Sequence, residues 1–481
     1  MTAPRLSHFI GGEVVAATDG ARHAHHNPSD SADVVAQVPT GDASAVHRAT
    51  AAAAESLTAW RRLAGPIRAD HLYTWSARIG DRQEELAQAV CREVGKPIGE
   101  ARGEVARCIT ILRYYAGEAV RPIGDVIPAQ AAGAFQYSLR EPLGVVALIT
   151  PWNFPLAIPL WKAAPALAFG NTVVLKPSEM SSHVATLLAE TARQAELPAG
   201  VFNVVLGTGQ GSGAPLLRAP DVHAISFTGS VRVGREVAAV AAERNIRYQT
   251  EMGGKNVVVV LADADLDRAA ALTAAGAMRF AGQKCTATSR AIVAAEVEND
   301  FAAALRSQID RLPLGPPSDP ATAVGPLISA AARDGIRRTL EEANAESVYA
   351  GSLPEGDGFA RGNYLAPLVV RGNDPDAILA QRELFGPVLT TFVARDVEEA
   401  IALANRTPYG LSASLFTRDL RQAMRWVQEI DVGLVRVNGD TTGVDPHAPF
   451  GGMKGSSSGS REQGPAAREF YTELKTVQIH P

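Results

Sequence analysis

Two kinds of hydrophobic spacing alternate along this chain. After a short start that resembles a hairpin, apolar residues recur every three or four positions, as in "ASAVHRATAAAAESLTAW" and "EELAQAVCREV", which predicts amphipathic helices. From Gly144 onward, short apolar runs such as "GVVALIT", "TVVLK" and "VHAISF" alternate with helical stretches. Strands that are apolar on both faces are typical of βαβ units, so the pattern predicts a doubly wound parallel sheet of the α/β class.

A second series of apolar runs begins at "NVVVVL", residues 256–261, and continues with "RAIVAAEV" and "DFAAALRSQIDRL", which predicts a second α/β domain. Residues 313–326 are rich in proline and glycine, as surface connections are. The C-terminal stretch "FYTELKTVQIH" predicts an edge strand. An edge strand this apolar needs a cover, which favours a partner subunit.

Composition and charge exclude several classes of protein. With 481 residues the chain exceeds one ordinary core, and a prior of about 150 residues per domain predicts two or three domains. Hydrophobic residues make up 46% and charged residues 20%, which is typical of an ordered globular protein. The net charge of -5 provides no positive field, so we expect no nucleic-acid partner. No signal sequence and no apolar run of ~18 residues is present, so we expect a cytoplasmic protein without membrane contact.

The chain has three cysteines, whose spacing matches no zinc or redox motif, so we expect no metal site. Cys91 and Cys108 lie in helical patterns beside apolar residues, which predicts packing in a core. Cys285 stands in "GQKCTATSR", among small and polar residues where a packing cysteine is not expected. It is therefore our candidate nucleophile.

Further stretches have compositions suited to a functional site. "ITPWNFPL", residues 149–156, ends a predicted strand with an aromatic residue, an asparagine and two prolines, and open α/β sheets bind ligands at such carboxyl ends. "TEMGGKN", residues 250–256, places Glu251 beside paired glycines that permit close backbone approach. "RELFGPV", residues 382–388, has an acid and an aromatic residue before a Gly-Pro pair.

These stretches belong to a series of motifs, in the order "PWNFP", "LKPSE", "FTGS", "EMGGKN", "GQKC", "ELFGP" and "PFGG". In this order, and over nearly the whole chain, they resemble the aldehyde dehydrogenase superfamily. The resemblance implies a dinucleotide-binding domain, an α/β catalytic domain and a small β extension for assembly into a homodimer or homotetramer. The dinucleotide-binding domain is expected at residues 1–119 and 142–252, and the catalytic domain at residues 253–437. The extension is expected at residues 120–141 and 455–481.

The resemblance also implies the chemistry. The Cys285 thiolate would attack an aldehyde carbon, and the side-chain amide of Asn153 and the backbone N–H of Cys285 would donate to the oxyanion. Hydride transfer to a nicotinamide ring would leave a thioester on the cysteine. Glu251 matches the family's general base, which would deprotonate the water that hydrolyses this thioester to a carboxylate product.

NAD is the expected cofactor, with NADP as the alternative. Glu179 in "LKPSE" matches a ribose ligand whose carboxylate would repel a 2′-phosphate, and Ser230 in "FTGSVRVG" opens a helix whose amides could face the pyrophosphate. "GTGQGSGA", residues 207–214, fits a nominal dinucleotide fingerprint, but we interpret it as a turn near the adenine. The residues expected to bind the cofactor are Trp152, Lys176, Ser178, Glu179, Gly229, Ser230, Gly234, Glu383 and Phe385.

Several alternatives stay open. A CoA-acylating aldehyde dehydrogenase characteristically lacks the base that Glu251 matches, and a catalytically silent protein on the same fold is a second alternative. For the substrate, the motifs look most like the branch of 2,5-dioxovalerate (α-ketoglutaric semialdehyde) dehydrogenases. A carboxylate on the aldehyde needs a cation, whereas the expected channel mouth, residues 438–452, carries Asp440 and Asp445. Aromatic and aliphatic aldehydes therefore remain candidate substrates.

Overall fold

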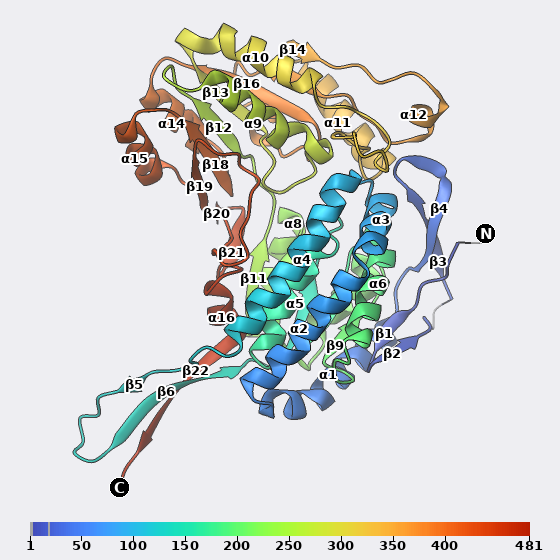
Figure 1. Cartoon of the computed structure of the whole chain (residues 1–481), viewed down its shortest axis with the longest axis vertical. Coiled ribbons are helices and arrows are strands. Elements are labelled where there is room, and N and C mark those ends of the chain that lie inside the picture. Colours follow the sequence, from blue (N-terminus) through green and yellow to red (C-terminus); the bar gives the residue numbers. More distant parts are fainter. Residues whose placement is uncertain (1–2, 18–19) are drawn as a thin grey trace.

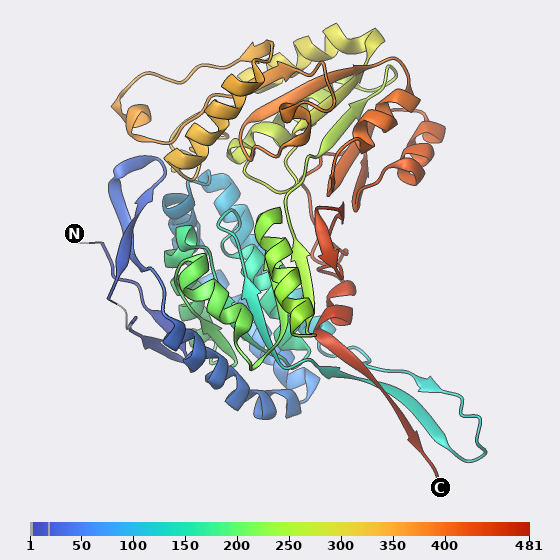
Figure 2. The same cartoon turned by 180° about the vertical axis from the view of Figure 1, so that it is seen from behind.

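Two large β-sheets, each covered by helices on both faces, organise this chain (Figure 1). The structure is a computed structural model and describes residues 3–17 and 20–481. One sheet has eight strands and the other has seven, and a smaller three-stranded sheet forms an arm that projects from the body beside the first sheet (Figure 2).

The first sheet has the order β2-β1-β9-β8-β7-β10-β11-β21. Its central strands, from β9 to β11 in that order, run parallel, which confirms the predicted doubly wound sheet. Antiparallel strands extend the sheet at both edges. The strands are β1 (His8–Ile10), β2 (Glu13–Val15), β7 (Val145–Ile149), β8 (Thr172–Lys176), β9 (Phe202–Val204), β10 (Val222–Thr228), β11 (Arg247–Glu251) and β21 (Ser457–Gly459).

Helices cover both faces of the first sheet, because successive side chains of a strand point to opposite faces. Val146 and Leu148 of β7 pack into the core beneath α2 to α6. Val145 and Ala147 pack into the other core, beneath α1, α7 and α8. Burial on both faces explains why these strands are continuous apolar runs. The helices are α1 (Ala43–Arg62), α2 (Gly65–Asp81), α3 (Gln83–Val94), α4 (Ile98–Glu118), α5 (Ala157–Ala168), α6 (Ser182–Gln194), α7 (Ala214–Arg218) and α8 (Val231–Glu243).

The second sheet has the order β14-β15-β16-β13-β12-β18-β19 and repeats this arrangement. Val258 and Val260 of β12 pack with α9, α10 and α11, whereas Val257 and Val259 pack with α13, α14 and α15. Its strands are β12 (Val257–Val260), β13 (Arg290–Ala294), β14 (Ser347–Ala350), β15 (Leu368–Arg371), β16 (Val388–Ala394), β18 (Ser412–Phe416) and β19 (Leu434–Val437). Its helices are α9 (Leu266–Met278), α10 (Glu298–Asp310), α11 (Ala330–Ala343), α12 (Asp357–Arg361), α13 (Ile378–Gln381), α14 (Val397–Asn405) and α15 (Leu420–Glu429). Within the described residues, no helix is both long and apolar enough to cross a membrane.

The projecting arm carries the C-terminal strand. β22 pairs with β6 along its whole length, from Thr472 opposite Pro142 to Ile479 opposite Phe135, and it lies at a sheet edge as the sequence predicts. Apolar side chains on the arm are exposed, with Leu474 at 57%. The arm consists of β5 (Val126–Ile127), β6 (Phe135–Pro142) and β22 (Thr472–Ile479), and two short pairs complete the chain, β3 (Arg22–Asn27) with β4 (Asp30–Pro39) and β17 (Tyr409–Gly410) with β20 (Met453–Lys454).

Part of the predicted β extension lies elsewhere. The sequence assigns residues 455–481 to the arm, but within them β21 pairs with β11 of the first sheet. The helix that follows, α16 (Ala466–Tyr471), packs into the core beneath α2 to α6. A three-residue strand of serine and glycine has no hydrophobic pattern, so its sequence cannot indicate which sheet it joins.

Two of the cysteines lie in the interior, as predicted. Cys91 of α3 and Cys108 of α4 are buried in the core beneath the first sheet's helices. Burial raises the pKa of the Cys91 thiol to about 12. Both thiols are therefore protonated packing groups at neutral pH, and only Cys285 is partly exposed.

Candidate active site

The predicted site residues gather where the edges of the two sheets meet. Ile149 at the end of β7 lies opposite Lys176, the last residue of β8. Thr228 at the end of β10 lies opposite Glu251, the last residue of β11. The carboxyl ends of parallel strands share one edge, and Asn153 comes four residues after the end of β7. Segments about 100 residues apart in the sequence therefore meet there.

The second sheet contributes the amino ends of its strands. Cys285 precedes β13 and Glu383 precedes β16, and these two parallel strands are neighbours. Direct contacts join the two edges: the Asn153 side-chain amide donates to the Gln283 carbonyl at 3.0 Å. The charge of Glu251 also raises the pKa of Cys285. The structure thus brings Cys285, Asn153 and Glu251 to one centre.

A buried asparagine holds the cysteine loop. The Asn256 side-chain amide donates to the carbonyls of Cys285 and Ala287, each at 2.8 Å. Its Oδ1 accepts from the Ser412 backbone N–H at 3.0 Å. Sequence analysis missed this residue, although it ends the quoted stretch "TEMGGKN". The available signal was its position, between paired glycines and a strand made only of valines. A polar side chain next to such a buried strand needs hydrogen-bond partners in the protein interior.

The backbone before the cysteine is left-handed over three consecutive residues. Phe280, Ala281 and Gly282 have φ values of 54°, 50° and 67°. The first two are strained, because a Cβ disfavours this region. A Cβ on Gly282 would lie 2.3 Å from the Gly386 carbonyl oxygen, so the cysteine loop can approach the Glu383 loop this closely only with glycine there.

The Cys285 thiol is protonated at neutral pH in the chain alone. Burial raises its pKa to about 12, and the charges of Glu383 and Glu251 add to this effect. The backbone N–H groups of Thr286 and Cys285 act in the opposite direction, because they stabilise the thiolate. A base or a change of surroundings must therefore accompany any attack by this sulfur.

Asn153 combines burial with a spare donor. Its side chain is almost fully buried, and one of its two amide N–H groups is engaged by the Gln283 carbonyl. The second N–H of the amide is not used in this contact. Gln283 is itself fixed, because its side chain donates to the Pro326 carbonyl at 3.1 Å and accepts from the Ile328 backbone N–H at 2.9 Å.

Glu251 is buried, and its two carboxylate oxygens differ. Oε2 accepts from the Ser457 hydroxyl at 2.5 Å, whereas Oε1 has no hydrogen-bond partner among the described residues. Burial raises the pKa of Glu251 well above its usual range, and the nearby charge of Glu462 adds to the shift. Ser457, Lys162 and Arg461 oppose it. A raised pKa makes the carboxylate form of this group a stronger base, which suits a general base.

A buried ion pair lies next to Glu251, and sequence analysis missed it. The Lys162 ammonium of α5 contacts the Glu462 carboxylate and donates to the Ser226 hydroxyl at 2.9 Å. Gln249 of β11 also donates to Ser226, at 2.8 Å. The available signal was a single lysine inside the apolar stretch "LAIPLWKAAPALAF", because a lysine there needs a buried counter-ion.

Three predicted cofactor residues lie together at the end of β8. The Lys176 ammonium is 3.6 Å from the Glu179 carboxylate. Burial lowers the pKa of Lys176, and Glu179 opposes this shift. The Ser178 hydroxyl accepts from the Met180 backbone N–H at 3.2 Å and so shapes the turn that presents Glu179.

The N-terminus of α8 fits a phosphate group. Ser230 caps this helix by accepting from the Val233 backbone N–H at 3.4 Å, and Ser230 itself is exposed. A Cβ on Gly234 would lie 2.4 Å from the Met252 sulfur. A Cβ on Gly229 would lie 2.6 Å from the ring of Phe227, which belongs to β10. Glycine at both positions allows the helix to pack closely, and helix N-termini are sites where phosphate groups bind.

Glu383 and Phe385 complete this side of the site. Glu383 accepts from the Gly254 backbone N–H at 3.1 Å, and burial raises its pKa to about 7. Phe385, at φ 55°, meets the Trp152 ring edge to face with 5.7 Å between the centroids. A carboxylate beside an aromatic pair, an exposed helix N-terminus and the Lys176–Glu179 pair together suit the ribose, phosphate and ring groups of a dinucleotide.

The nominal fingerprint at residues 207–214 packs against the protein itself. Residues Gly209–Gly213 form one turn of π-helix ahead of α7. A Cβ on Gly211 would lie 2.4 Å from the Thr40 carbonyl, and one on Gly207 would lie 2.3 Å from the Ser212 hydroxyl. These glycines therefore allow chain segments to pack tightly, whereas a phosphate loop would present its backbone outward.

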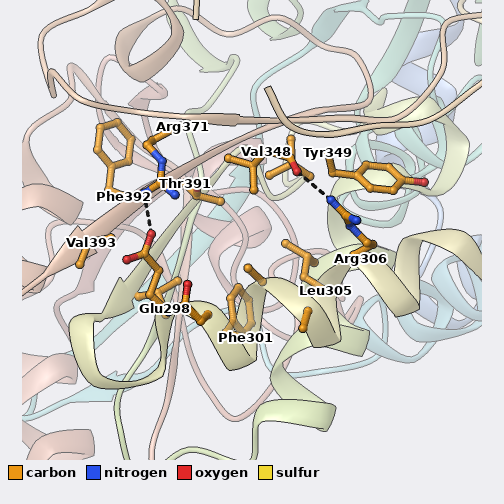
Figure 3. A pocket seen from close by; sticks show the side chains of 15 residues that line it. Glu298, Phe301, Leu305, Arg306, Val348, Tyr349, Arg371, Thr391, Phe392 and Val393 are labelled. Carbon is orange, nitrogen blue, oxygen red and sulfur yellow. Dashed lines mark hydrogen bonds and ion pairs between the residues drawn. The ribbon is translucent and has the colours of Figure 1, made fainter. Parts of the chain in front are cut away.

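A separate pocket lies between α10 and strands β14 to β16 of the second sheet (Figure 3). Phe301 and Leu305 of α10 line one side of it, Phe392 and Arg371 line the other, and Arg371 pairs with Glu298 at 2.5 Å. None of the predicted site residues lines it. We therefore do not assign the chemistry to this pocket.

Comparisons with known proteins agree with this arrangement. Residues 15–477 match the model described as the aldehyde dehydrogenase family. The chain is 43% identical to an alpha-ketoglutaric semialdehyde dehydrogenase of Bacillus subtilis, with 98% of each chain covered. It is 40% identical to an alpha-ketoglutarate semialdehyde dehydrogenase of Haloferax volcanii, with 99% of each covered. A solved NAD-dependent aldehyde dehydrogenase of Sinorhizobium meliloti superposes with a TM-score of 0.95 at 37% identity, covering 100% of this chain and 95% of that one.

The raised pKa of Cys285 predicts how its reactivity depends on pH. Since the thiolate is the reactive form, alkylation by iodoacetamide without dinucleotide should rise about tenfold per pH unit from pH 7 to 9. Mass spectrometry of the labelled peptide measures this rate. The Cys285→Ala variant, which retains the buried Cys91 and Cys108, serves as the control and should label only slowly. A rate that levels off below pH 8 would contradict the raised pKa.

Proposed function

This chain belongs to the aldehyde dehydrogenase family, and on that premise we propose that it oxidises a carboxylate-bearing aldehyde to the acid with NAD as acceptor. Membership of the family makes the protein an oxidoreductase that acts on aldehydes. The observation that carries the proposal is the meeting of Cys285, Asn153 and Glu251 between the two sheets.

In the proposed reaction, the Cys285 thiol releases its proton to solvent, the sulfur forms a bond to the aldehyde carbon, and the C=O π bond breaks so that the carbonyl oxygen takes up negative charge. The spare N–H of Asn153 and the backbone N–H of Cys285 donate to that oxygen. NAD, when bound, supplies the hydride acceptor. Glu251 then takes a proton from the water that attacks the thioester, and its Oε1, which has no partner among the described residues, is the oxygen available for this proton.

The choice of NAD rests on Glu179. Its carboxylate lies at the end of β8 beside Lys176, where the family resemblance expects the adenosine ribose. A 2′-phosphate there would meet this negative charge, whereas two hydroxyl groups could donate to it. The Sinorhizobium meliloti structure is described as NAD-dependent, which supports the same choice.

The substrate proposal is 2,5-dioxovalerate. The relatives from Bacillus subtilis and Haloferax volcanii carry the name of this semialdehyde, and both match this chain over almost its full length. The predicted channel mouth also supports this substrate, because one of its two acidic side chains is engaged in hydrogen bonds within its own loop. Asp440 accepts from the backbone N–H groups of Thr442 and Gly443 at 2.9 and 3.1 Å. Its carboxylate therefore shapes its own loop.

We propose that the active form is a homodimer or a homotetramer. The projecting arm supports this proposal, because apolar side chains on it are exposed. Leu474 and Ile479 of β22 are 57% and 52% exposed, and Phe135 of β6 is 51% exposed. Apolar side chains on an open strand edge favour a cover by another chain.

The substrate and the cofactor can be tested in one kinetic comparison. We expect kcat/KM for 2,5-dioxovalerate to exceed that for pentanal and benzaldehyde by at least tenfold, and NAD to be preferred over NADP. NADH or NADPH absorbance measures each rate. Equal or higher values for the uncharged aldehydes would contradict the proposed substrate, and a higher kcat/KM with NADP would contradict the cofactor choice.

Replacing Glu179 tests the basis of the cofactor choice. Glu179→Gln keeps the side-chain volume but removes the charge, so the ratio of kcat/KM for NAD to that for NADP should fall about tenfold. Glu190→Gln removes a carboxylate from the neighbouring helix α6, where it pairs with Arg193, and is the matched control. An unchanged ratio in Glu179→Gln would show that another group excludes the phosphate.

Replacing Glu251 tests the hydrolytic step. Glu251→Gln cannot take a proton, so steady turnover should fall by ~10²- to 10⁴-fold, the usual contribution of a general base. The acyl thioester should then accumulate on Cys285, and a burst of up to one NADH per site should precede the slow phase. Mass spectrometry of the quenched protein detects the adduct.

Two results would contradict this assignment. Turnover of Glu251→Gln at the wild-type rate would exclude Glu251 as the base. Product release by the wild type only after addition of CoA would identify a CoA-acylating enzyme. The Cys285→Ala variant is the control, because it should form neither the adduct nor the burst while it still binds the dinucleotide.

A further inference from the structure

Two structural elements contact the residues on either side of Cys285. The Lys284 ammonium lies 2.8 Å from the Glu100 carboxylate in the first turn of α4. The Thr441 hydroxyl donates to the Thr286 carbonyl at 2.7 Å. The partly exposed Cys285 therefore lies between α4 and the segment that begins at Thr441.

These two elements also contact each other further from the cysteine. We call residues 441–449 the mouth loop. The Arg107 guanidinium of α4 lies 3.9 Å from the Asp445 carboxylate of this loop. Seven residues further along α4, the Tyr114 ring lies near the His447 ring of the mouth loop, with 6.4 Å between the centroids. The cation that a carboxylate-bearing substrate requires is thus present, on the helix that faces the loop.

We propose that Arg107 is the specificity-determining residue that binds the carboxylate of the aldehyde substrate, with Asp445 as the counter-ion that this carboxylate replaces. The inference rests on the proposed function, since it names the group that would recognise the acid end of the same substrate. Arg107 acts by binding and takes no part in bond making at Cys285.

The dimensions of α4 agree with this role. Glu100, which contacts the residue next to Cys285, and Arg107 are seven residues apart, which is about 10 Å along a helix. The aldehyde carbon and the carboxylate carbon of extended 2,5-dioxovalerate are about 5 Å apart. An arginine side chain is long enough to cover the difference, so the aldehyde can lie at the sulfur while the carboxylate meets the guanidinium.

The exchange of Asp445 for a substrate carboxylate is favourable. Both partners of the existing pair are solvent-exposed, at 39% for Arg107 and 66% for Asp445, and a 3.9 Å contact between exposed groups is weak. A substrate carboxylate can bind a guanidinium through two parallel hydrogen bonds, which is a stronger arrangement. Lys284 is less available, because its ammonium is mostly buried against Glu100.

The test compares two aldehydes of equal chain length, 2,5-dioxovalerate and pentanal, which lacks the carboxylate. In Arg107→Met, kcat/KM for 2,5-dioxovalerate should fall by about 10- to 100-fold more than that for pentanal, because charged hydrogen bonds of this kind are lost. The change should appear mainly in KM. Arg107→Lys should restore part of the difference, since it returns the charge without the paired geometry.

Two further variants sharpen the test. Asp445→Asn should lower KM for 2,5-dioxovalerate, because it removes the competing carboxylate. Arg102→Met is the matched control: Arg102 lies on the same helix, but it pairs with Glu84 of α3. It should leave the preference between the two aldehydes unchanged.

The outcomes separate this inference from the proposed function. A wild-type enzyme that prefers pentanal would overturn the proposed substrate and this inference with it. A wild-type preference for 2,5-dioxovalerate that Arg107→Met leaves intact would overturn the role of Arg107 alone. Arg279 is an exposed cation six residues before Cys285. If Arg279→Met, and not Arg107→Met, selectively lowered kcat/KM for 2,5-dioxovalerate, the carboxylate site would be assigned to Arg279.

Discussion

The crossing from the first sheet to the second is the constraint on which the site depends. Glu251 ends β11, Asn256 directly precedes β12, and only four residues lie between them. The paired glycines in this crossing leave no room for side chains: a Cβ on Gly253 would lie 1.9 Å from a Glu383 carboxylate oxygen. The candidate base therefore belongs to one sheet and the anchor of the cysteine loop to the other, and a tightly packed backbone sets their separation.

Electrostatics at this centre follow from the same packing. Burial raises the pKa values of Cys285 and Glu383 to about 12 and about 7, and it raises that of Glu251 well above its usual range. The charges of Glu383 and Glu251 add to the rise at Cys285, so the chain alone favours the thiol form of the cysteine. Binding of a group that contributes positive charge beside the cysteine would lower the pKa of its thiol.

The sequence predicts the parts whose signal is local. Continuous apolar runs such as β7 and β12 identified both sheets, and the motif residues proved to lie at adjoining strand ends. Partners that are distant along the chain were missed. Lys162 and Glu462 are 300 residues apart, and no spacing rule connects them. The short strand β21 and the anchoring role of Asn256 were missed for the same reason, because each depends on a neighbour supplied by the fold.

The ion pair between Lys162 and Glu462 has a consequence for the order of folding. Lys162 is fully buried in α5, but its counter-ion enters the chain only after the whole second sheet has been synthesised. A first domain that folds before then would hold an unpaired buried ammonium, a state that costs several kcal/mol. The closing strand β21 arrives equally late. The first domain can therefore reach its final stability only once the C-terminal segment that follows the second domain has joined it.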